Sequence, residues 1–487
     1  MDWGSALIGG AATLCLQTIA GAVPKWRRRE EPPTCLDNRP LIRPLIENHF
    51  RPVATDNITI SERRFPFRVR ADLQRAMDRL FAAGTTVTYF CGVEKEYCGD
   101  GLKFTHLLVD SHPPALSVPP QYEEVDIGEA EPVRCLKNGL WLLNDGGNKY
   151  VVLLGPAGYC GQATGILFQI AAANDREGTR ITQAFFKHLE ASVLKAESYR
   201  GKVLSLELGE NSYSGESRGI MVHRLRTVTR EQVVLPKKTL ELLERNVIQF
   251  VKRREQLSRY RQATRKGILF YGPPGTGKTH TIHYLAGTLA GHTTLLISAE
   301  QVWLLSEYMT LARLLQPSVV VIEDADLIAR ERSQMGACEE VLLNKLLNEM
   351  DGLKEDADIL FILTTNRPEA LEGALTSRPG RIDQAIEYPL PDEEGREKLI
   401  RLYAQGIDLT DDLIHTLVQR TDRASPAFIK ELMRRSVQFH LERSDDAHLE
   451  LADVESALDE LLCSGGSLNA KLLGAAIGHE EDRSCQR

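Results

Sequence analysis

The sequence is short of cysteine, of net positive charge and of certain motifs, and each shortage excludes a class of protein. Nine cysteines are scattered through 487 residues without a Cys-x-x-Cys pair, which argues against a disulfide framework or a zinc site and favours a reducing compartment. The net charge of −8 gives no overall basic field, which argues against nucleic acid as the main partner. No His-Glu-x-x-His motif occurs, which argues against a fused metalloprotease.

Long apolar runs are also scarce, with one exception close to the N-terminus. Residues 5–23 contain no charge over nineteen positions, and Lys25 and residues 27–29, all arginine, come directly after them. That length is close to what a membrane-spanning helix needs, and basic residues after a span place the rest of the chain in the cytoplasm or its equivalent. The run is rich in alanine and glycine, so a packed N-terminal helix is the alternative. We expect a cytoplasmic protein, with membrane anchoring through residues 5–23 left open.

The composition that remains is that of a globular protein. Hydrophobic residues make up 43 % and charged residues 26 % of the chain, close to the averages of folded proteins. At roughly 150 residues per domain, the length predicts about three domains. Residues 25–69, rich in arginine and proline, predict a linker, and residues 70–230 predict a separate α/β or α+β domain. Within it, apolar spacing predicts helices at 70–83 and 182–197, strands at 86–93, 103–109 and 149–155, and a loop at 113–120.

One glycine-rich segment of this domain imitates a phosphate-binding loop. Residues 155–161, Gly-Pro-Ala-Gly-Tyr-Cys-Gly, follow an expected strand, but no Lys-Ser or Lys-Thr pair comes after them. We therefore expect a turn between two elements there.

The octet from Gly272 to Thr279 has the complete phosphate-loop pattern, including the Lys-Thr pair that is missing after residues 155–161. It follows an expected strand and precedes a helical pattern, which is the context of a phosphate-binding loop. Glycines let backbone N–H groups point at the phosphates, and the helix N-terminus adds its dipole. Lys278 is expected to neutralise phosphate charge and Thr279 to bind Mg²⁺. The residues expected to contact ATP are Gly272, Pro273, Pro274, Gly275, Thr276, Gly277, Lys278, Thr279 and His280.

A basic helical stretch precedes the strand that leads into this loop. Its cations would usually form a solvated face, and a supporting electrostatic role toward the phosphates is the alternative. They are Lys252, Arg253, Arg254, Arg259 and Arg261.

Polar residues follow two further apolar strands. Glu323 and Asp324 follow residues 319–322, and Asn366 comes shortly after residues 359–364. Fully apolar runs of this length are typical of strands covered on both faces, and ligands bind at the carboxyl ends of parallel strands. We expect one carboxylate to hold the Mg²⁺ shell and the other to polarise the attacking water, which Asn366 would orient.

Five motifs occur in the order seen in AAA ATPases of the AAA+ superfamily, and the resemblance covers about Leu235 to Leu462. The motifs are GPPGTGKT, VVVIED, LLNKLLNEMDGL, LTTN and SRPGRID. The resemblance implies a P-loop α/β core with a five-stranded parallel sheet, a C-terminal helical lid, and a ring, usually a homo-hexamer. It also implies that Arg378 and Arg381 reach the γ-phosphate held by a neighbouring subunit, where they supply positive charge.

With this resemblance, the chain divides into six segments. These are an apolar N-terminal segment at 1–24, a linker at 25–69, an N-terminal substrate or partner domain at 70–230, an AAA ATPase core at 231–392, a helical lid at 393–463 and a polar tail at 464–487. The lid is also indicated without the resemblance, because Ser425 followed by Pro426 is typical of a helix start.

The sequence departs from the family pattern in three places. The usual order of the acidic pair is Asp then Glu, whereas Glu323, on the metal side, precedes Asp324 here. One extra residue before Arg378 makes Arg381 the stronger candidate for the arginine that acts on the neighbour. Residues 299–315 replace the aromatic-hydrophobic-glycine loop that grips polypeptide in ring unfoldases. Trp303 and Tyr308 are the candidate grips in that segment, and core packing is the alternative.

The Glu-Asp order and the Ser-Pro-Ala of the lid are similar to the mitochondrial AAA chaperones that assemble respiratory complex III, which are anchored at the N-terminus. Their N-terminal domain is not recognisable in this sequence.

The leading functional hypothesis is Mg²⁺-dependent ATP hydrolysis by a ring that remodels or disassembles a protein or protein complex, which residues 70–230 would select. A membrane-anchored chaperone for assembly or translocation of folded cargo is the second. A nucleotide-gated scaffold is the third.

Overall fold

The computed structural model describes the chain from residue 39 to residue 464 with internal gaps. The described ranges are 39–82, 85–95, 101–109, 113–159, 162–207, 219–330, 346, 348–350, 352, 357–371, 381–444 and 446–464. The apolar run at 5–23, the polar tail and Arg378 lie outside them, as do several positions of the LLNKLLNEMDGL motif. No helix within these ranges is both long and apolar enough to cross a bilayer.

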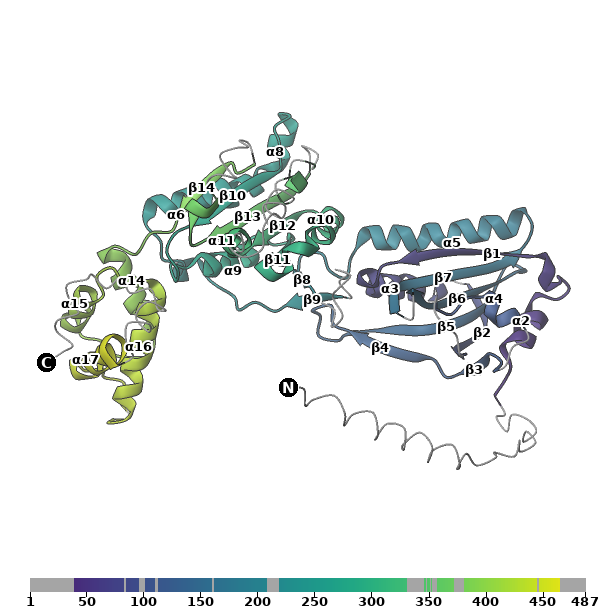
Figure 1. Cartoon of the computed structure of the whole chain (residues 1–487), viewed down its shortest axis with the longest axis horizontal. Helices are drawn as coiled ribbons and strands as arrows, with labels where there is room; N and C mark the ends of the chain where they lie inside the picture. Colours follow the sequence, from purple (N-terminus) through teal and green to yellow (C-terminus); the bar gives the residue numbers. More distant parts are fainter. Residues whose placement is uncertain are drawn as a thin grey trace, which may run out of the picture.

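The N-terminal domain is built on an antiparallel sheet of seven strands with helices on both faces (Figure 1). Alternate residues of its central strands supply two separate cores, because successive side chains of a strand point to opposite faces. Trp141 and Leu143 pack with α3 and α5, whereas Leu140 and Leu142 pack with α2 and α4. The helices are α2 (Ile42–Phe50), α3 (Arg70–Ala82), α4 (Thr105–Leu108) and α5 (Arg176–Lys195).

The strand order of this sheet is β1-β7-β6-β5-β2-β3, and β4 pairs with β5. All of the pairs are antiparallel. The strands are β1 (Ile58–Phe65), β2 (Thr86–Glu94), β3 (Leu116–Val118), β4 (Gln121–Val125), β5 (Val133–Asp145), β6 (Asn148–Tyr159) and β7 (Gln162–Ala173).

Four local expectations for this half of the chain differ from the structure. The second half of the expected linker contains α2 and β1, whose apolar residues belong to the domain core. Residues 103–109, expected to be a strand, contain the short helix α4, which buries Leu107. Residues 113–120, expected to be a loop, contain β3. The imitation phosphate loop is mostly strand, because β6 runs to Tyr159 before the chain turns into β7.

The second sheet has the order β14-β10-β13-β12-β11-β8-β9. The five strands from β14 to β11 pair in parallel, as expected for the ATPase core. They are β10 (Lys266–Tyr271), β11 (Thr293–Ile297), β12 (Ser318–Ile322), β13 (Ile359–Thr365) and β14 (Gln384–Glu387). One face packs against α6 (Lys237–Leu243) and α9 (Lys278–Thr288), and the other packs against α10 (Leu305–Leu314).

Two additional strands extend this sheet. Both lie before residue 230, where the sequence predicts the boundary between the N-terminal domain and the ATPase core. β8 (Val203–Leu206) pairs in parallel with β11, and β9 (Ile220–His223) pairs antiparallel with β8. The first domain therefore gives way to the second sheet near residue 200.

The junction between the two domains is packed and hydrogen-bonded. One hydrophobic cluster contains Tyr199 together with residues of both halves. The Arg200 guanidinium donates to Leu314 O at 2.8 Å, at the end of α10, and also contacts Gln316 O, while its Nε donates to Lys195 O at 2.6 Å, at the end of α5. A cation at two helix C-termini is favourable because it meets the negative ends of their dipoles.

The basic stretch that leads into β10 lies at the wrong end of the strand to support phosphates. The phosphate loop follows β10, whereas Arg254 and its basic neighbours precede it, so six strand residues separate them. Arg254 is buried, and its Nε donates to Thr264 O at 2.8 Å. The other four basic residues are exposed, as a solvated face predicts, and the alternative of electrostatic support for the phosphates is wrong.

The lid consists of four helices with a core of its own. Its third helix begins as expected, because Ser425 Oγ accepts from Phe428 N at 3.1 Å and Pro426 occupies the first helical turn. The helices are α14 (Glu393–Tyr403), α15 (Asp411–Arg420), α16 (Pro426–Leu441) and α17 (Leu451–Asp459).

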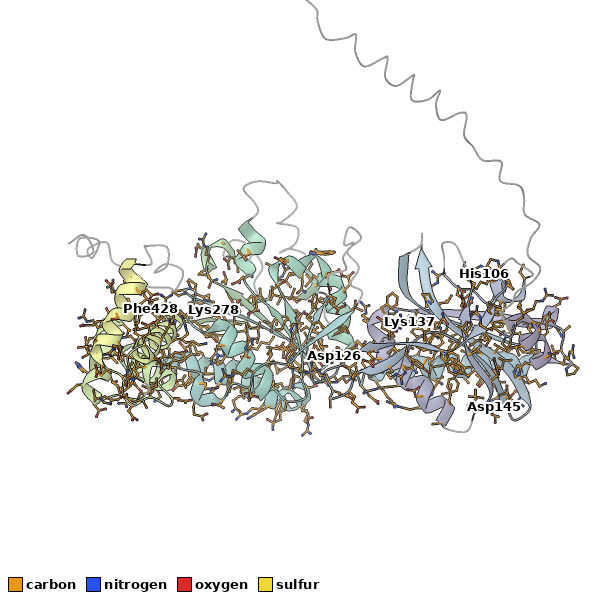
Figure 2. All side chains as sticks on the ribbon, turned by 90° about the horizontal axis from the view of Figure 1, so that it is seen from below. His106, Asp126, Lys137, Asp145, Lys278 and Phe428 are labelled. Carbon is orange, nitrogen blue, oxygen red and sulfur yellow. The ribbon has the colours of Figure 1, made fainter. Side chains whose placement is uncertain are left out.

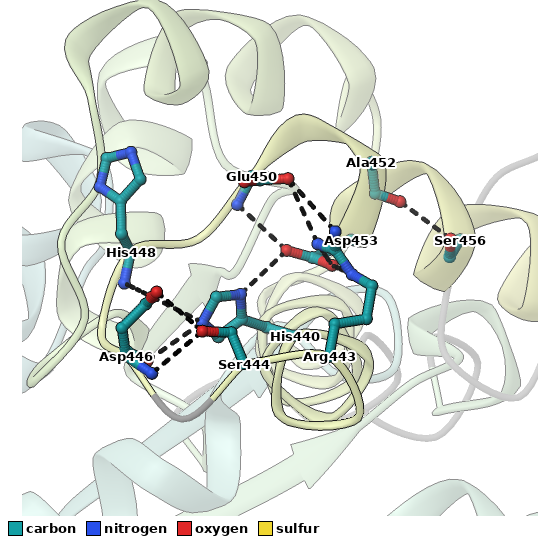
Figure 3. A network of polar contacts seen from close by, with 9 residues as sticks. All are labelled: His440, Arg443, Ser444, Asp446, His448, Glu450, Ala452, Asp453 and Ser456. Atoms are coloured by element: carbon teal, nitrogen blue, oxygen red, sulfur yellow. Dashed lines mark hydrogen bonds and ion pairs between the residues drawn. The ribbon is translucent and has the colours of Figure 1, made fainter.

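A polar network around the buried His440 and Asp453 joins the end of α16 to α17 (Figure 3). His440 Nδ1 lies 3.2 Å from Asp453 Oδ2, and its Nε2 lies 3.1 Å from Asp446 Oδ1. Asp453 also contacts Arg443 and accepts from Glu450 N at 3.1 Å. Because ionised carboxylates only accept hydrogen bonds, both ring nitrogens must donate, which requires the imidazolium form of His440.

Candidate nucleotide site

Three strand ends meet at one edge of the second sheet. β13 lies between β10 and β12, so the loop after β10, the acidic pair after β12 and Asn366 after β13 are neighbours. A pocket of about 400 Å³ lies there between the core and the lid. Figure 2 shows Lys278 in the core, close to the lid that carries Phe428. The sequence therefore places its separate motifs around one cavity.

The phosphate loop has the backbone that its glycines allow. Gly277 has a φ of 96° and immediately precedes α9, in a conformation that other residues rarely adopt. Gly275 has a φ of 75°, and a Cβ there would lie 2.9 Å from Ala427 Cβ in the lid. Gly275 O accepts from Ala427 N at 3.2 Å. The lid thus rests directly on the phosphate loop.

Lys278 is buried and turned onto the loop itself. Its Nζ donates to Gly272 O at 2.8 Å and to Pro273 O at 2.9 Å. Burial lowers the pKa of Lys278 to about 8, against the opposing effect of the carboxylates of Asp324 and Asp326. A nearby phosphate would favour the charged form in the same way as these carboxylates.

Thr279 and Glu323 meet across the site as the sequence predicts. Thr279 Oγ1 donates to Glu323 Oε1 at 2.8 Å. Two oxygens that converge at the first turn of α9 suit Mg²⁺, which is usually held by one or two protein oxygens, substrate phosphates and water. One hydroxyl and one carboxylate oxygen therefore fit a magnesium ion that is bound mainly by phosphates and water.

Asp324 and Asn366 form a direct pair beside the loop. Asn366 Nδ2 donates to Asp324 Oδ1 at 3.1 Å, and both residues line the pocket. Asp324 has a φ of 49°, which is unfavourable for a residue with a Cβ. Its backbone N donates to Thr364 Oγ1 at 3.0 Å, which helps to hold that conformation.

Part of the pocket lining comes from two segments that sequence reasoning missed. One is the segment 232–235 before α6, whose Gln232 O lies 3.2 Å from His280 Nε2. Because a carbonyl only accepts, His280 carries its proton on Nε2. Burial lowers the pKa of His280, which favours this neutral form. The other segment is in the lid, where Leu399, Tyr403 and Lys430 line the pocket.

Asp326 and Thr364 were also missed. Asp326 follows the acidic pair by two residues and Thr364 lies within the LTTN motif, but only the pairing of β12 with β13 brings these two residues together. The signal available in the sequence was the spacing of Asp326 after Glu323 and Asp324, which is equally typical of the first turn of a helix.

Other predicted residues are not brought into this pocket. Arg381 is 8 % exposed and is not among the pocket-lining residues. Arg378 lies outside the described ranges. Tyr308 is fully buried, and its hydroxyl accepts from Leu206 N at 2.8 Å, so its role as an exposed grip is wrong. Trp303 is half-buried and donates to Glu300 O at 2.6 Å.

Residues 268–390 match the family model described as "ATPase family associated with various cellular activities (AAA)". This stretch contains the phosphate loop, the acidic pair and Asn366. Residues 268–390 form an AAA domain, of the AAA+ ATPase superfamily. This AAA domain is the parallel sheet described above, and AAA domains bind ATP.

Curated relatives match about half of this chain. A proteasome-activating nucleotidase of Methanothermobacter thermautotrophicus is 31 % identical over 53 % of this chain and 63 % of its own length. A cell division cycle protein 48 homologue of Archaeoglobus fulgidus is 30 % identical over 55 % of this chain and 38 % of its own. An ATP-dependent zinc metalloprotease FtsH 2 of Symbiobacterium thermophilum is 30 % identical over 43 % of this chain and 38 % of its own.

This AAA protein thus spans less than two thirds of the length of these relatives.

Proposed function

We propose that this protein hydrolyses ATP with Mg²⁺ and uses the energy to remodel or disassemble a protein or protein complex. The observation that carries the first part is the Asn366 to Asp324 pair, which faces the phosphate loop in the pocket between core and lid. The names of the relatives, a proteasome-activating nucleotidase and a metalloprotease among them, support a protein as the substrate.

Each residue of the site has a separate role in the proposed hydrolysis of ATP. Loop N–H groups and Lys278 hold the β- and γ-phosphates, and the α9 N-terminus adds its dipole. Thr279 and Glu323 would hold Mg²⁺, which neutralises developing charge on the phosphates when it is bound. Asp324 accepts a hydrogen bond from the attacking water. Asn366 orients both the Asp324 carboxylate, to which its Nδ2 donates, and that water. Hydrolysis requires no covalent bond to the protein.

The reversed acidic pair is compatible with this division. Glu323 is one methylene longer than the usual aspartate, and it reaches Thr279 Oγ1 at 2.8 Å. Asp324 is shorter than the usual glutamate, and its left-handed backbone and bond to Asn366 hold its carboxylate at the pocket. We therefore expect turnover from the Glu-Asp order.

Phosphate release with and without a chelator of Mg²⁺ tests the hydrolysis. Lys278→Ala should abolish nucleotide binding and turnover, and removal of Mg²⁺ should stop turnover of the parent protein. Lys398→Ala is the control, because this exposed lysine pairs only with Glu394 in the described part of the lid. Turnover that persists in Lys278→Ala would contradict the site.

Ring assembly, as a homo-hexamer, is the second part of the proposal. The support for a role of Arg381 at a neighbouring subunit is its position in the SRPGRID motif. Arg378 is the second candidate for this role. Arg381→Ala should bind ATP but turn it over slowly, and mixing it with Lys278→Ala subunits should partly restore activity. Full activity of Arg381→Ala alone would contradict the role in trans.

Assembly or translocation of folded cargo is a second candidate function, and a specific observation favours it. In ring unfoldases, the segment after the strand that corresponds to β11 carries the polypeptide grip. Here that segment, residues 299–315, packs against β8. Gln301 Nε2 donates to Leu206 O at 2.9 Å, and Tyr308 bonds to Leu206 N, so the segment is fastened to β8. Loss of remodelling with intact ATPase activity in Trp303→Ala would favour threading, whereas unchanged remodelling would favour folded cargo.

A further inference from the structure

Asp326 is a buried carboxylate beside the nucleotide pocket that the mechanism above does not use. Its side chain is 3 % exposed, and it lies in the first turn of α11 (Ala325–Arg330), two residues after Asp324. It does not belong to the lining of the pocket, whereas Asp324 does. A carboxylate removed from water needs strong hydrogen bonds to offset its lost hydration.

The hydrogen bonds that Asp326 accepts fix the end of β13. Its Oδ1 accepts from Thr365 Oγ1 at 2.9 Å and from Asn366 N at 3.1 Å. Thr365 Oγ1 accepts in turn from Arg367 N at 2.9 Å. The backbone is therefore held on both sides of Asn366, at the point where the chain leaves the sheet.

The side chain of Asn366 is the part of this arrangement that reaches the pocket. Its Nδ2 donates to Asp324 Oδ1 at 3.1 Å. Its Oδ1 is buried and has no hydrogen-bond partner among the described residues. A buried acceptor without a partner is unfavourable, so this oxygen is suited to a donor that enters the pocket, such as water. The amide can then hold Asp324 and a water at the same time.

We propose that Asp326 is a positioning residue for ATP hydrolysis, which fixes Asn366 so that its amide aligns Asp324 with the attacking water. This inference rests on the proposed function. It assigns Asp326 no contact with nucleotide, metal or water. Its contribution is the acceptor atom that two donors at the end of β13 share.

Two substitutions of Asp326 test whether its acceptor oxygen, and not its negative charge, is what ATP hydrolysis needs. Asp326→Asn keeps an Oδ1 that can accept from Thr365 and Asn366, so it should retain turnover within about 5-fold. Asp326→Ala removes the acceptor, and kcat should fall by about 100-fold, the cost of a misplacement near 1 Å. KM for ATP should change much less than kcat in both variants, because the phosphate loop is untouched.

Asp72→Ala is the matched control. Asp72 is 4 % exposed and accepts from Ser198 N at 3.0 Å, but it lies in the N-terminal domain. It should lose thermal stability as Asp326→Ala does, while kcat per folded protein stays near the parent value. Equal losses of kcat in Asp72→Ala and Asp326→Ala would mean that Asp326 has only a structural role and would overturn the inference.

Amide hydrogen exchange of the nucleotide-free protein tests the positioning without any turnover. Exchange at Asn366 should accelerate in Asp326→Ala but not in Asp326→Asn or Asp72→Ala. An unchanged rate at Asn366 would overturn the positioning, whatever the activity. A parent protein that does not hydrolyse ATP would instead overturn the proposed function, and the exchange result would still decide whether Asp326 holds Asn366.

Discussion

Replacing Thr364 by valine should separate stability from catalysis at this site. The change keeps the shape of a side chain that is 2 % exposed but removes the hydroxyl that accepts from Asp324 N at 3.0 Å. Leaving that N–H without a partner should cost about 1–3 kcal/mol of unfolding free energy. The left-handed conformation of Asp324 is already unfavourable by about 1–2 kcal/mol in the parent, so the backbone should relax once the bond that holds it is lost, which recovers part of that energy.

Relaxation would move the Asp324 carboxylate away from Asn366 and disrupt the pair. We expect kcat for ATP to fall by about 10- to 100-fold, with a much smaller change in nucleotide affinity, because the alignment of the water is lost while the phosphate loop remains. The assays are phosphate release, titration with a fluorescent nucleotide and thermal unfolding. Each kcal/mol should lower Tm by about 2–4 °C for a domain of this size.

Thr293→Val is the matched control for this experiment. Thr293 is fully buried and accepts from Gly201 N at 3.0 Å, but it begins β11 at the opposite end of the sheet. Its hydroxyl also donates to Leu315 O at 3.1 Å, so its replacement should lower Tm at least as much while leaving kcat near the parent value. If Thr364→Val hydrolysed ATP at the rate of Thr293→Val, the role of Thr364 in holding Asp324 would be refuted.

Three further predictions concern the lid and the segment after β11. Burial lowers the pKa of His440, but its contacts with Asp446 and Asp453 outweigh burial and raise the pKa above its ordinary value of about 6.5. These contacts therefore stabilise the fold fully below about pH 6.5, and the stabilisation is lost as pH rises through the higher pKa of the folded state. In His440→Gln, that decline of Tm at rising pH should be absent. Phe428→Ala should destabilise the lid core by about 3–5 kcal/mol and weaken nucleotide binding, as measured by calorimetry and titration. Tyr308→Phe leaves Leu206 N without its partner, so amide exchange at Leu206 should accelerate while nucleotide affinity stays unchanged.

The parts of the site that could be predicted from the sequence are those encoded by contiguous residues. The phosphate loop is such a part, because its glycines, Lys278 and Thr279 lie within one turn and one helix start. The contact between Thr279 and Glu323 could also be predicted, since both follow apolar strands whose carboxyl ends share one edge of a parallel sheet.

The parts that could not be predicted depend on which strands are neighbours. Asp326 and Thr364 acquire roles only because β12 lies beside β13, and nothing local distinguishes Asp326 from a residue in an ordinary first helical turn. Of the basic residues before β10, four are exposed as a solvated face predicts, whereas the burial of Arg254 could not be predicted because its partners Thr264 and Asp358 lie further along the chain.

In the N-terminal half, the sequence also failed to predict the type of one helix and the sheet to which two strands belong. Residues 103–109 are apolar over too short a length to distinguish a strand from the helix turn that forms there. β8 and β9 follow the first domain without a change in composition, so only their pairing with β11 reveals which sheet they extend.

The fate of ATP bound to Asp324→Asn is the sharpest test of the proposed hydrolysis. Quenched-flow measurement of bound nucleotide, with Mg²⁺ present, follows binding and cleavage in one experiment. We predict that the variant binds ATP with an affinity near that of the parent and retains it uncleaved, because the group that polarises the water is lost while Lys278 and the loop remain. Cleavage of bound ATP at the parent rate would contradict the assignment of Asp324 and the mechanism built on it.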